Sequence, residues 1–305
     1  MIPPVGIMRH TVMPDTSGVG AQSASPIWKV GERTLEFTHR PHIMGILNVT
    51  PDSFSDGSLF LDPERAVERA LEMEEAGADS IDIGGESTRP FAPAVAEDQE
   101  LQRVIPVIER LAGRLRVPIS IDTYKASVAR EAIRAGAEIV NDISGGTFDP
   151  RMLDVVAAST AGLVVMHTRG KPTEMQRNTS YAAIIPEIIQ FLRERLSAAG
   201  SRGIAPERIV VDPGIGFGKS LQGNLEILRN LEQLAVLDRP ILIGTSRKTF
   251  IGTILGREVE DRAFGTAATI ALAVANGASI LRVHDVRSMR DAAIMAHAVI
   301  RPPAE

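Results

Sequence analysis

Cysteine is absent from this sequence of 305 residues. Without thiols the chain can form no disulfide bond and no thiolate metal site, which fits a reducing compartment. The chain also lacks the roughly 18 consecutive apolar residues that a membrane-spanning helix needs. Its first 25 residues, rich in Pro, Gly, Ser and Met, lack the apolar segment of a signal peptide. We therefore predict a cytoplasmic protein with no membrane association.

An excess of basic charge is missing as well. The 33 lysines and arginines are outnumbered by 38 aspartates and glutamates, and the formal net charge is −5. A general nucleic-acid-binding protein would carry a basic excess, so no nucleic-acid partner is expected. An anionic ligand would have to be met by a local cluster of basic side chains. The hydrophobic fraction of 44% is ordinary for a protein with a large core.

A nucleotide-binding phosphate loop is also missing, although the run D-P-G-I-G-F-G-K-S from Asp212 looks like one at first sight. The pattern G-x-x-x-x-G-K-[ST] requires a glycine five positions before Gly218, where Pro213 stands. Proline removes a backbone N–H group and fixes φ, which is the opposite of what a phosphate cradle needs. The dinucleotide pattern G-x-G-x-x-G fails too, because Lys219 occupies the place of its third glycine. A nucleoside triphosphatase is therefore not favoured.

A recurring helix-to-strand pattern is present instead. It appears in E-E-A-G-A-D-S-I-D-I-G-G from Glu74, in I-R-A-G-A-E-I-V-N-D-I-S-G-G from Ile133 and in V-A-N-G-A-S-I-L-R-V-H-D from Val274. Each segment is predicted to be a helix that ends at a glycine with left-handed backbone, followed by a short apolar strand. This is the second half of a βαβ unit, repeated.

Eight short apolar segments predict the strands of a parallel sheet. They lie at 43–49, 80–84, 118–122, 138–143, 162–167, 208–212, 240–245 and 279–284, separated by helical patterns such as 63–76 and 186–199. Apolar strands that alternate with helices indicate a parallel sheet covered on both faces. Eight such units over about 260 residues match an α/β fold of the (β/α)8 TIM barrel type, with a doubly wound open sheet as the alternative.

The chain is therefore expected to form a single barrel domain over residues 26–305. Residues 1–25 are predicted to be a disordered N-terminal extension. The runs I-W-K-V and R-T-L-E-F, within the first 40 residues, are predicted to form a small hairpin that closes the bottom of the barrel.

Polar residues follow every predicted strand, where barrel enzymes build their active sites. The residues at these ends include Asn48, Thr88, Arg89, Asp122, Asn141, Asp142, Met166, His167, Asp212, Ser246, Arg247, Lys248, Arg282 and His284. Singly, several have structural explanations: Asp122 can be a helix N-cap, His167 or His284 a buried structural histidine, and Lys219 a solvated loop residue. Likewise, Arg247 and Lys248 can form a surface charge pair. The convergence of eight polar ends on one rim favours a functional site.

The chemistry of these residues divides into two groups. Arg89, Arg282 and His284, with Thr88 and Asn48, can bind a phosphorylated or diphosphorylated group, because arginine recognises oxygens with two parallel donors. Asn48 can also take part in Mg²⁺ coordination. The second group is Asp122, Asn141 and Asp212, whose acceptor oxygens suit the N–H edges of a heterocycle, while Lys248 can meet its carbonyl or ring nitrogen. The sequence predicts a ligand with a flat polar ring and a phosphate tail.

Two long segments resemble the signatures of the dihydropteroate synthase family. They are M-G-I-L-N-V-T-P-D-S-F-S-D-G from Met44 and G-G-E-S-T-R-P from Gly84. The later segments I-S-I-D-T, I-V-N-D-I, D-P-G-I-G-F-G-K, G-T-S-R-K and R-V-H-D follow in the order of that family, so the resemblance covers about residues 42–300. It implies a (β/α)8 barrel and a homodimer. The implied activity joins 4-aminobenzoate to 6-hydroxymethyl-dihydropterin diphosphate and releases pyrophosphate with Mg²⁺.

The resemblance also implies roles for individual residues. Asn48 matches the asparagine associated with Mg²⁺. The pterin pocket corresponds to Asp122, Asn141, Asp212 and Lys248, with Met166 near the ring. Thr88 and Arg89 lie on a mobile second loop, and Arg282 and His284 match an anion-binding pair that, with these two, would act in catalysis. Phe217 and Ser246 resemble the residues flanking 4-aminobenzoate, and Phe54 and Pro90 the loop residues that complete its pocket.

Three positions depart from the commoner pattern of the family. Phe91 replaces a glycine, Tyr124 replaces a serine, and H-T-R-G from His167 replaces H-M-x-G. None of these changes removes a named ligand, although Phe91 is placed to affect closure of the second loop or binding of aminobenzoate analogues.

Two alternatives stay open at this point. A pterin-binding methyltransferase barrel shares the aspartate and asparagine pocket but does not need the T-R-P loop or the S-R-K turn. A non-catalytic relative would be expected to have lost anion-binding residues, whereas Asn48, Arg89, Arg282 and His284 are all present.

Overall fold

The computed structural model describes residues 27–50 and 62–302. The extension predicted over residues 1–25, and Phe54 of the first signature segment, lie outside the described residues.

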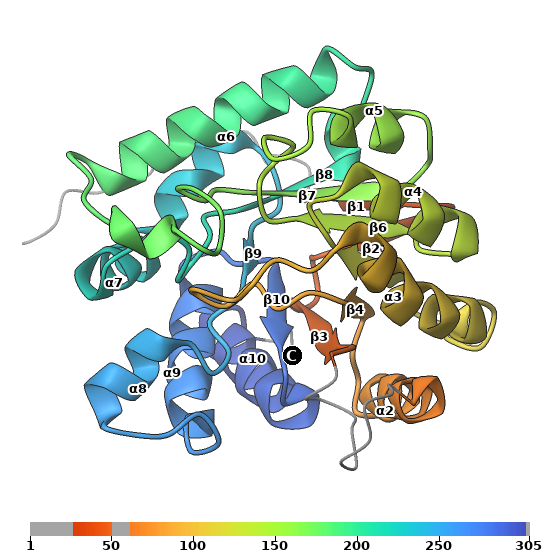
Figure 1. Ribbon diagram of the computed structural model, residues 1–305. Coiled ribbons are helices and arrows are strands. Elements are labelled where there is room, and N and C mark those ends of the chain that lie inside the picture. Colours follow the sequence, from red (N-terminus) through yellow and green to blue (C-terminus); the bar gives the residue numbers. More distant parts are fainter. Residues whose placement is uncertain (1–26, 51–61, 303–305) are drawn as a thin grey trace, which may run out of the picture.

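Eight parallel strands form a closed barrel (Figure 1). They are β3 (His42–Asn48), β4 (Ser80–Gly84), β5 (Ile119–Asp122), β6 (Ile139–Asp142), β7 (Gly162–Met166), β8 (Ile209–Asp212), β9 (Leu242–Ile243) and β10 (Ile280–Val283). Neighbouring strands pair in the order β8-β7-β6-β5-β4-β3-β10-β9, and a parallel bridge between Val211 and Ile241 joins β8 to β9. The barrel prediction is confirmed, with each strand limit within two residues of its predicted place.

Helices follow the strands and surround the barrel. They are α2 (Pro63–Glu75), α3 (Glu97–Leu111), α4 (Ala126–Ala135), α5 (Met152–Ala157), α6 (Ile184–Gly200), α7 (Leu221–Arg229), α8 (Thr249–Leu255), α9 (Ala263–Ala275) and α10 (Val286–Ile300), with short 3₁₀ helices η1 (Met175–Arg177), η2 (Pro206–Arg208) and η3 (Leu231–Leu237). Within residues 27–50 and 62–302, no helix has both the length and the apolar character needed to cross a membrane.

The alternation of side chains along the strands divides the buried residues into two layers. In β4, Ile81 and Ile83 belong to the large apolar core between strands and helices, together with Val104 and Ile108 of α3. Successive strand residues point to opposite faces, so Asp82 lies on the inner face of the barrel. Ordinary hydrophobic packing thus fills the outer layer, and the inside is free to hold polar groups.

An N-terminal hairpin fills the bottom of the barrel, as the sequence predicted. Strands β1 (Ile27–Val30) and β2 (Arg33–Glu36) pair antiparallel. Trp28 and Val30 pack in one cluster with inward residues of the strands, including Val164 and Val210. Gly162 makes this contact possible, because a Cβ atom there would lie 2.5 Å from Cγ1 of Val30.

The glycines of the repeated helix-to-strand pattern have the expected backbone conformation. Gly77, Gly136 and Gly277 have φ angles of +96°, +119° and +93°. Residues with a Cβ atom rarely adopt this region, so glycine ends each helix and lets the chain enter the next strand.

Candidate active site

A network of buried charges lies inside the barrel and is centred on Asp82, which is 0% exposed. Arg282 donates from Nε to Oδ2 of Asp82 and from Nη2 to Oδ2 of Asp122, both at 2.6 Å. Asn141 donates from Nδ2 to the same Asp82 oxygen at 2.9 Å, and Ser120 donates to its Oδ1 at 2.6 Å. Four strands of the barrel are thereby joined through one carboxylate.

Asp122 is not a helix cap, so that explanation is wrong. Helix α4 begins at Ala126, whose N–H is accepted by Asp149 at 3.1 Å. Asp122 instead pairs with Arg282 across the barrel, and its Oδ1 atom is buried with no hydrogen-bond partner among the described residues. Within the same part of the chain, Nη1 of Arg282 makes no hydrogen bond either. A buried acceptor without a partner is costly, and it indicates the place of a ligand N–H group.

The glycine-rich run that follows β8 forms a tight turn directly after Asp212. Oδ1 of Asp212 accepts the N–H of Gly214 at 2.6 Å. Gly214, Gly216 and Gly218 all have positive φ, and a Cβ atom on Gly214 would lie 2.0 Å from the carbonyl oxygen of His167. These glycines allow the close approach of two strand ends, and the run is not a phosphate cradle.

The interpretation of Lys219 as a solvated loop residue is wrong. Its side chain is buried, with Nζ 2.9 Å from Nδ1 of His167, and it donates to the carbonyl oxygens of Phe217 at 2.8 Å and of His167 at 3.2 Å. It therefore ties the end of β7 to the turn after β8. The alternative that His167 is a structural histidine is consistent with this burial and with its edge contact to Phe191.

The end of β9 contributes Ser246 and Lys248. Nζ of Lys248 lies 4.2 Å above the ring of Phe217, which belongs to a buried cluster with Met166. Oγ of Ser246 accepts the backbone N–H of His284 at 3.2 Å and lies 3.0 Å from its Nδ1. The alternative that Arg247 and Lys248 are simply two surface charges is wrong, because Nζ of Lys248 lies over the buried ring of Phe217 and Arg247 pairs with Asp285.

Four predicted site residues, Asn48, Thr88, Arg89 and Pro90, lie on the rim and make no side-chain hydrogen bond to the network within the described part of the chain. Asn48 is half-buried at the end of β3, beside Gly84 of β4. Thr88 is half-buried, whereas Arg89 and Pro90 are exposed. The structure thus brings together Asp82, Asp122, Asn141 and Arg282, which we call the polar floor of the barrel. The residues of the second loop lie apart from it.

Sequence reasoning missed Asp82. Its signal is a charged residue in the middle of the apolar strand S-I-D-I-G, away from the strand end where barrel active sites are built.

Comparisons with known proteins agree with this geometry. The sequence model of the family described as pterin binding enzyme matches residues 44–284. The chain is 47% identical to dihydropteroate synthase of Synechocystis over 277 residues, which cover 90% of this chain and 96% of that protein. The chain belongs to the family of pterin-binding enzymes, as a dihydropteroate synthase.

Solved structures of one related enzyme are similar throughout. Dihydropteroate synthase of Xanthomonas albilineans with 4-aminobenzoic acid superposes with a TM-score of 0.85 at 45% identity, covering 92% of this chain and 100% of that one. The same enzyme in complex with 7,8-dihydropteroate has a TM-score of 0.82 at 43% identity, covering 91% and 100%.

Burial shifts the ionisation of the charged groups in this pterin-binding enzyme. Burial raises the pKa of Asp122 to about 7, which Arg282 opposes and the nearby Asp82 reinforces. It also raises the pKa of Asp212 to about 6 and lowers that of Lys248 to about 8. Arg282 has its pKa raised by the two carboxylates against the effect of burial, so it stays a cation.

His284 of the pterin-binding enzyme is a neutral imidazole. Burial and the charge of Arg282 lower its pKa to about 3. The hydroxyl of Ser246 accepts the backbone N–H of His284, which leaves its own proton to donate to Nδ1. We infer that the ring proton sits on Nε2, so His284 can offer a ligand a hydrogen bond.

The raised pKa of Asp122 should appear in the pH dependence of stability. A folded-state pKa above the unfolded value means that stability is present at low pH and is lost as pH rises from about 4 to about 7. We expect the free energy of unfolding, measured by urea titration, to fall with pH in this window. In Asp122→Asn that slope should be flatter by up to about 1.4 kcal/mol per pH unit.

Asp149→Asn is the control for this prediction. The hydrogen bond from Arg151 lowers the pKa of Asp149 to about 2, so its contribution is lost only in stronger acid. The slope between pH 5 and pH 7 should stay as in the wild type. If the free energy of unfolding changed with pH equally in the wild type and in Asp122→Asn, the raised pKa assigned to Asp122 would be contradicted.

Proposed function

We propose that the described network is the active site in which this enzyme joins 4-aminobenzoate to (7,8-dihydropterin-6-yl)methyl diphosphate, giving 7,8-dihydropteroate and pyrophosphate. The observation that carries the assignment is the partnerless, buried Oδ1 of Asp122 beside Asn141 and Arg282. The complexes of the related Xanthomonas enzyme with 4-aminobenzoic acid and with 7,8-dihydropteroate support the choice of substrates.

The pterin ring would lie on the polar floor of the barrel. Asp122 and Asp212 each keep an oxygen available for the amino and ring N–H groups, since only Oδ1 of Asp212 is used within the turn. Nζ of Lys248 lies over the ring of Phe217, where both carboxylates influence its charge, and it can donate to the pterin carbonyl or a ring nitrogen. Met166 supplies an apolar contact beside them.

The chemical step is a displacement at the methylene carbon of the pterin. The carbon–oxygen bond to the diphosphate breaks with its electron pair going to the leaving oxygen, and the aminobenzoate nitrogen forms the new bond and then loses a proton. Nη1 of Arg282 and Nε2 of His284 are the donors that can stabilise the departing charge. The carboxylates of Asp122 and Asp212 would stabilise positive charge developing on the ring.

The second substrate would bind at the outer end of the same pocket. Phe217 offers a ring face, while Ser246 and the second-loop residues Thr88 and Pro90 complete the surroundings. Arg89, exposed in the same loop, is the further cation for the diphosphate. An arylamine is a weak base, so we assign no catalytic triad.

One assay tests the whole assignment. The enzyme is incubated with Mg²⁺, the dihydropterin diphosphate and 4-aminobenzoate, and dihydropteroate and pyrophosphate are quantified. We expect equal amounts of the two products. No product from enzyme that still binds the pterin diphosphate would indicate a binding protein and contradict the assignment.

The residues on the rim fit Mg²⁺ bound together with the diphosphate. Among residues 27–50 and 62–302, no group of three acidic or histidine side chains could enclose a metal by itself. Mg²⁺ keeps several waters and takes few protein ligands besides phosphate oxygens, and the half-buried amide of Asn48 offers one oxygen. When bound, the ion would neutralise charge on the leaving pyrophosphate.

We propose that Asn48 is this ligand. Removing Mg²⁺ with a chelator should abolish product formation, and adding it back should restore it. In Asn48→Ala the Mg²⁺ concentration for half-maximal rate should rise about tenfold, the scale of disturbing a metal site. Asn230→Ala, at the end of α7, is the matched control. An unchanged Mg²⁺ dependence in Asn48→Ala would contradict the proposal.

We propose that the enzyme is a homodimer joined through α9 and α10. These helices pack against each other and lie together with α8 at the lower left of Figure 1. Helix α9 contains no charged residue, yet Phe264 and Leu272 on its outer side are 91% and 57% exposed. Met295 and Val299 of α10 are 64% and 77% exposed. A second copy of the chain carries the same apolar surface, so a symmetric dimer would bury these side chains.

Charges on this surface should break the dimer. In the double variant Phe264→Glu and Leu272→Glu, we expect the dissociation constant in sedimentation experiments to rise by about a hundredfold, because two carboxylates would be buried unpaired. Val236→Glu in η3, where the valine is 58% exposed, is the control and should sediment as the wild type does. A monomeric wild type at micromolar concentration would contradict the proposal. The cytoplasmic location stays a prediction from the sequence.

A further inference from the structure

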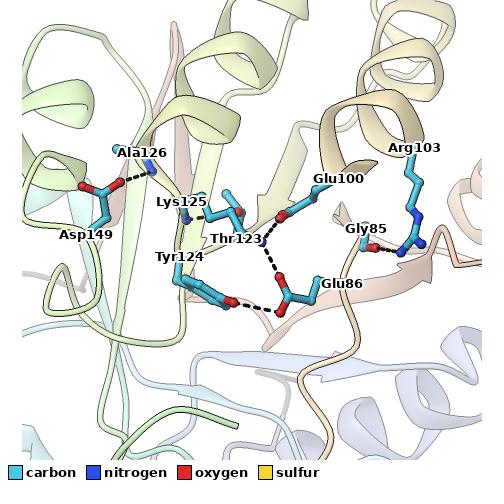
Figure 2. Close-up of polar contacts among 9 residues, drawn as sticks. All are labelled: Gly85, Glu86, Glu100, Arg103, Thr123, Tyr124, Lys125, Ala126 and Asp149. Carbon is cyan, nitrogen blue, oxygen red and sulfur yellow. Dashed lines mark hydrogen bonds and ion pairs between the residues drawn. The ribbon is translucent and has the colours of Figure 1, made fainter. Parts of the chain in front are cut away.

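The root of the loop that follows β4 is fixed by side chains of α3 and of the turn between β5 and α4. Glu86, which is 7% exposed, accepts a hydrogen bond from the hydroxyl of Tyr124 at 2.8 Å and forms an ion pair with Lys125. Lys125 also pairs with Glu100 of α3 (Figure 2). Glu86 is thus held by the turn between β5 and α4, which begins directly after Asp122.

The backbone beside Glu86 is held as well. Nη1 of Arg103, also on α3, donates to the carbonyl oxygen of Gly85 at 2.7 Å (Figure 2). Residues 85 and 86 are therefore attached to α3 and to the β5–α4 turn, by charged side chains in each case.

The far end of the same loop has a second attachment. The N–H of Phe91 donates to the carbonyl oxygen of Pro172, in the connection after β7, at 3.0 Å. Phe91 has a φ of +63°, a conformation that bulky residues adopt only where their surroundings enforce it. Thr88 and Arg89 lie between the two attachments, so their positions depend on both.

The ring of Tyr124 contacts the substrate pocket at the same time. It packs against the buried cluster of Met166 and Phe217, and it meets Phe148 edge to face at 5.6 Å between ring centroids. Burial and the hydrogen bond to Glu86 raise the pKa of Tyr124, so its hydroxyl remains a donor at neutral pH. A serine at this position would have no ring to join the cluster.

We propose that Tyr124 is a positioning residue for the second substrate, linking the loop that carries Thr88 and Arg89 to the pocket wall around Phe217. The inference rests on the proposed function, in which this loop and Phe217 surround 4-aminobenzoate. A phenol that donates to a carboxylate makes a strong hydrogen bond, so its loss should loosen the loop without disturbing the pterin floor at Asp122.

Tyr124→Phe removes the hydroxyl and keeps the ring, which makes it the sharpest test. We expect the KM for 4-aminobenzoate to rise about three- to tenfold, the scale of one lost hydrogen bond, with a smaller change in kcat. The dissociation constant of 6-hydroxymethyl-dihydropterin, which lacks the diphosphate that Arg89 would bind, should change by less than about twofold when measured by calorimetry without aminobenzoate. A merely structural role would weaken both substrates together.

Glu86→Gln is the second test variant, since the glutamine amide keeps an acceptor oxygen for Tyr124 but lacks the negative charge. The KM effect of Tyr124→Phe should be smaller in the Glu86→Gln background, because a hydrogen bond to a neutral acceptor is weaker. Wild-type kinetics in Tyr124→Phe, an equal effect in both backgrounds, or an equal loss of pterin affinity would each overturn the proposal. Absence of product from the wild-type enzyme would reject the proposed function instead, because that result involves neither variant.

Discussion

Replacing Arg282 by alanine should lower the turnover by one to three orders of magnitude, about the scale of losing one charge-stabilising donor. It should also lower the free energy of unfolding at pH 7 by about 3–5 kcal/mol, because it leaves buried charges without their partner. Arg282 is the shared cation of Asp82 and Asp122, which are 0% and 7% exposed. Turnover is measured by pyrophosphate release and stability by urea unfolding.

Two further variants separate the catalytic from the structural effect. Arg282→Lys keeps the charge without the two parallel donors, so it should recover stability more than turnover. Arg40→Ala breaks the pair of Arg40 with Asp79, at 2.6 Å, at the opposite end of the barrel. It should lower stability with little effect on turnover. Wild-type turnover in Arg282→Ala would defeat the role assigned to this residue.

Replacing Asp82 by alanine should have the second large effect, although Asp82 contacts no substrate in the proposed arrangement. Its loss leaves Arg282, Asn141 and Ser120 without their common acceptor inside the barrel. We expect the free energy of unfolding to fall by about 3–5 kcal/mol, as for breaking other buried ion pairs. Turnover should fall at least about tenfold, because Arg282 and Asn141 lose their fixed positions.

Ser120→Ala is the matched control for Asp82. It removes one donor and leaves the bonds from Arg282 and Asn141 intact, so it should cost about 1 kcal/mol of stability. A turnover in Asp82→Ala equal to that of Ser120→Ala would contradict the positioning role of Asp82.

Most of the fold could be predicted from local patterns. Apolar segments located the eight strands, and Gly77, Gly136 and Gly277 marked the ends of helices, because a left-handed backbone at a helix end strongly favours glycine. The polar rim followed, since parallel strands in a barrel all end on one face. The resemblance then gave individual residues their expected substrates.

The sequence around one strand end does not show which side chains of another strand end it contacts. Lys219 follows a glycine-rich turn that looks exposed, yet its Nζ donates a hydrogen bond in the interior to the carbonyl oxygen of His167, 52 positions earlier. Tyr124 was only a departure from a family pattern until the structure placed its hydroxyl against Glu86, 38 positions earlier. Such contacts depend on how closely two connections approach, which no local pattern encodes.

The local residue patterns are enough to predict a barrel with a polar rim and the kinds of side chain found there. Which charged side chains contact one another depends on how the whole barrel closes. Arg282 reaches Asp82 and Asp122 across separations of 200 and 160 positions, because β10 pairs with β3 and β3 pairs with β4. Side-chain periodicity specifies that Asp82 points to one face of its strand, but that this face is the inside of a closed barrel is a property of all eight strands together.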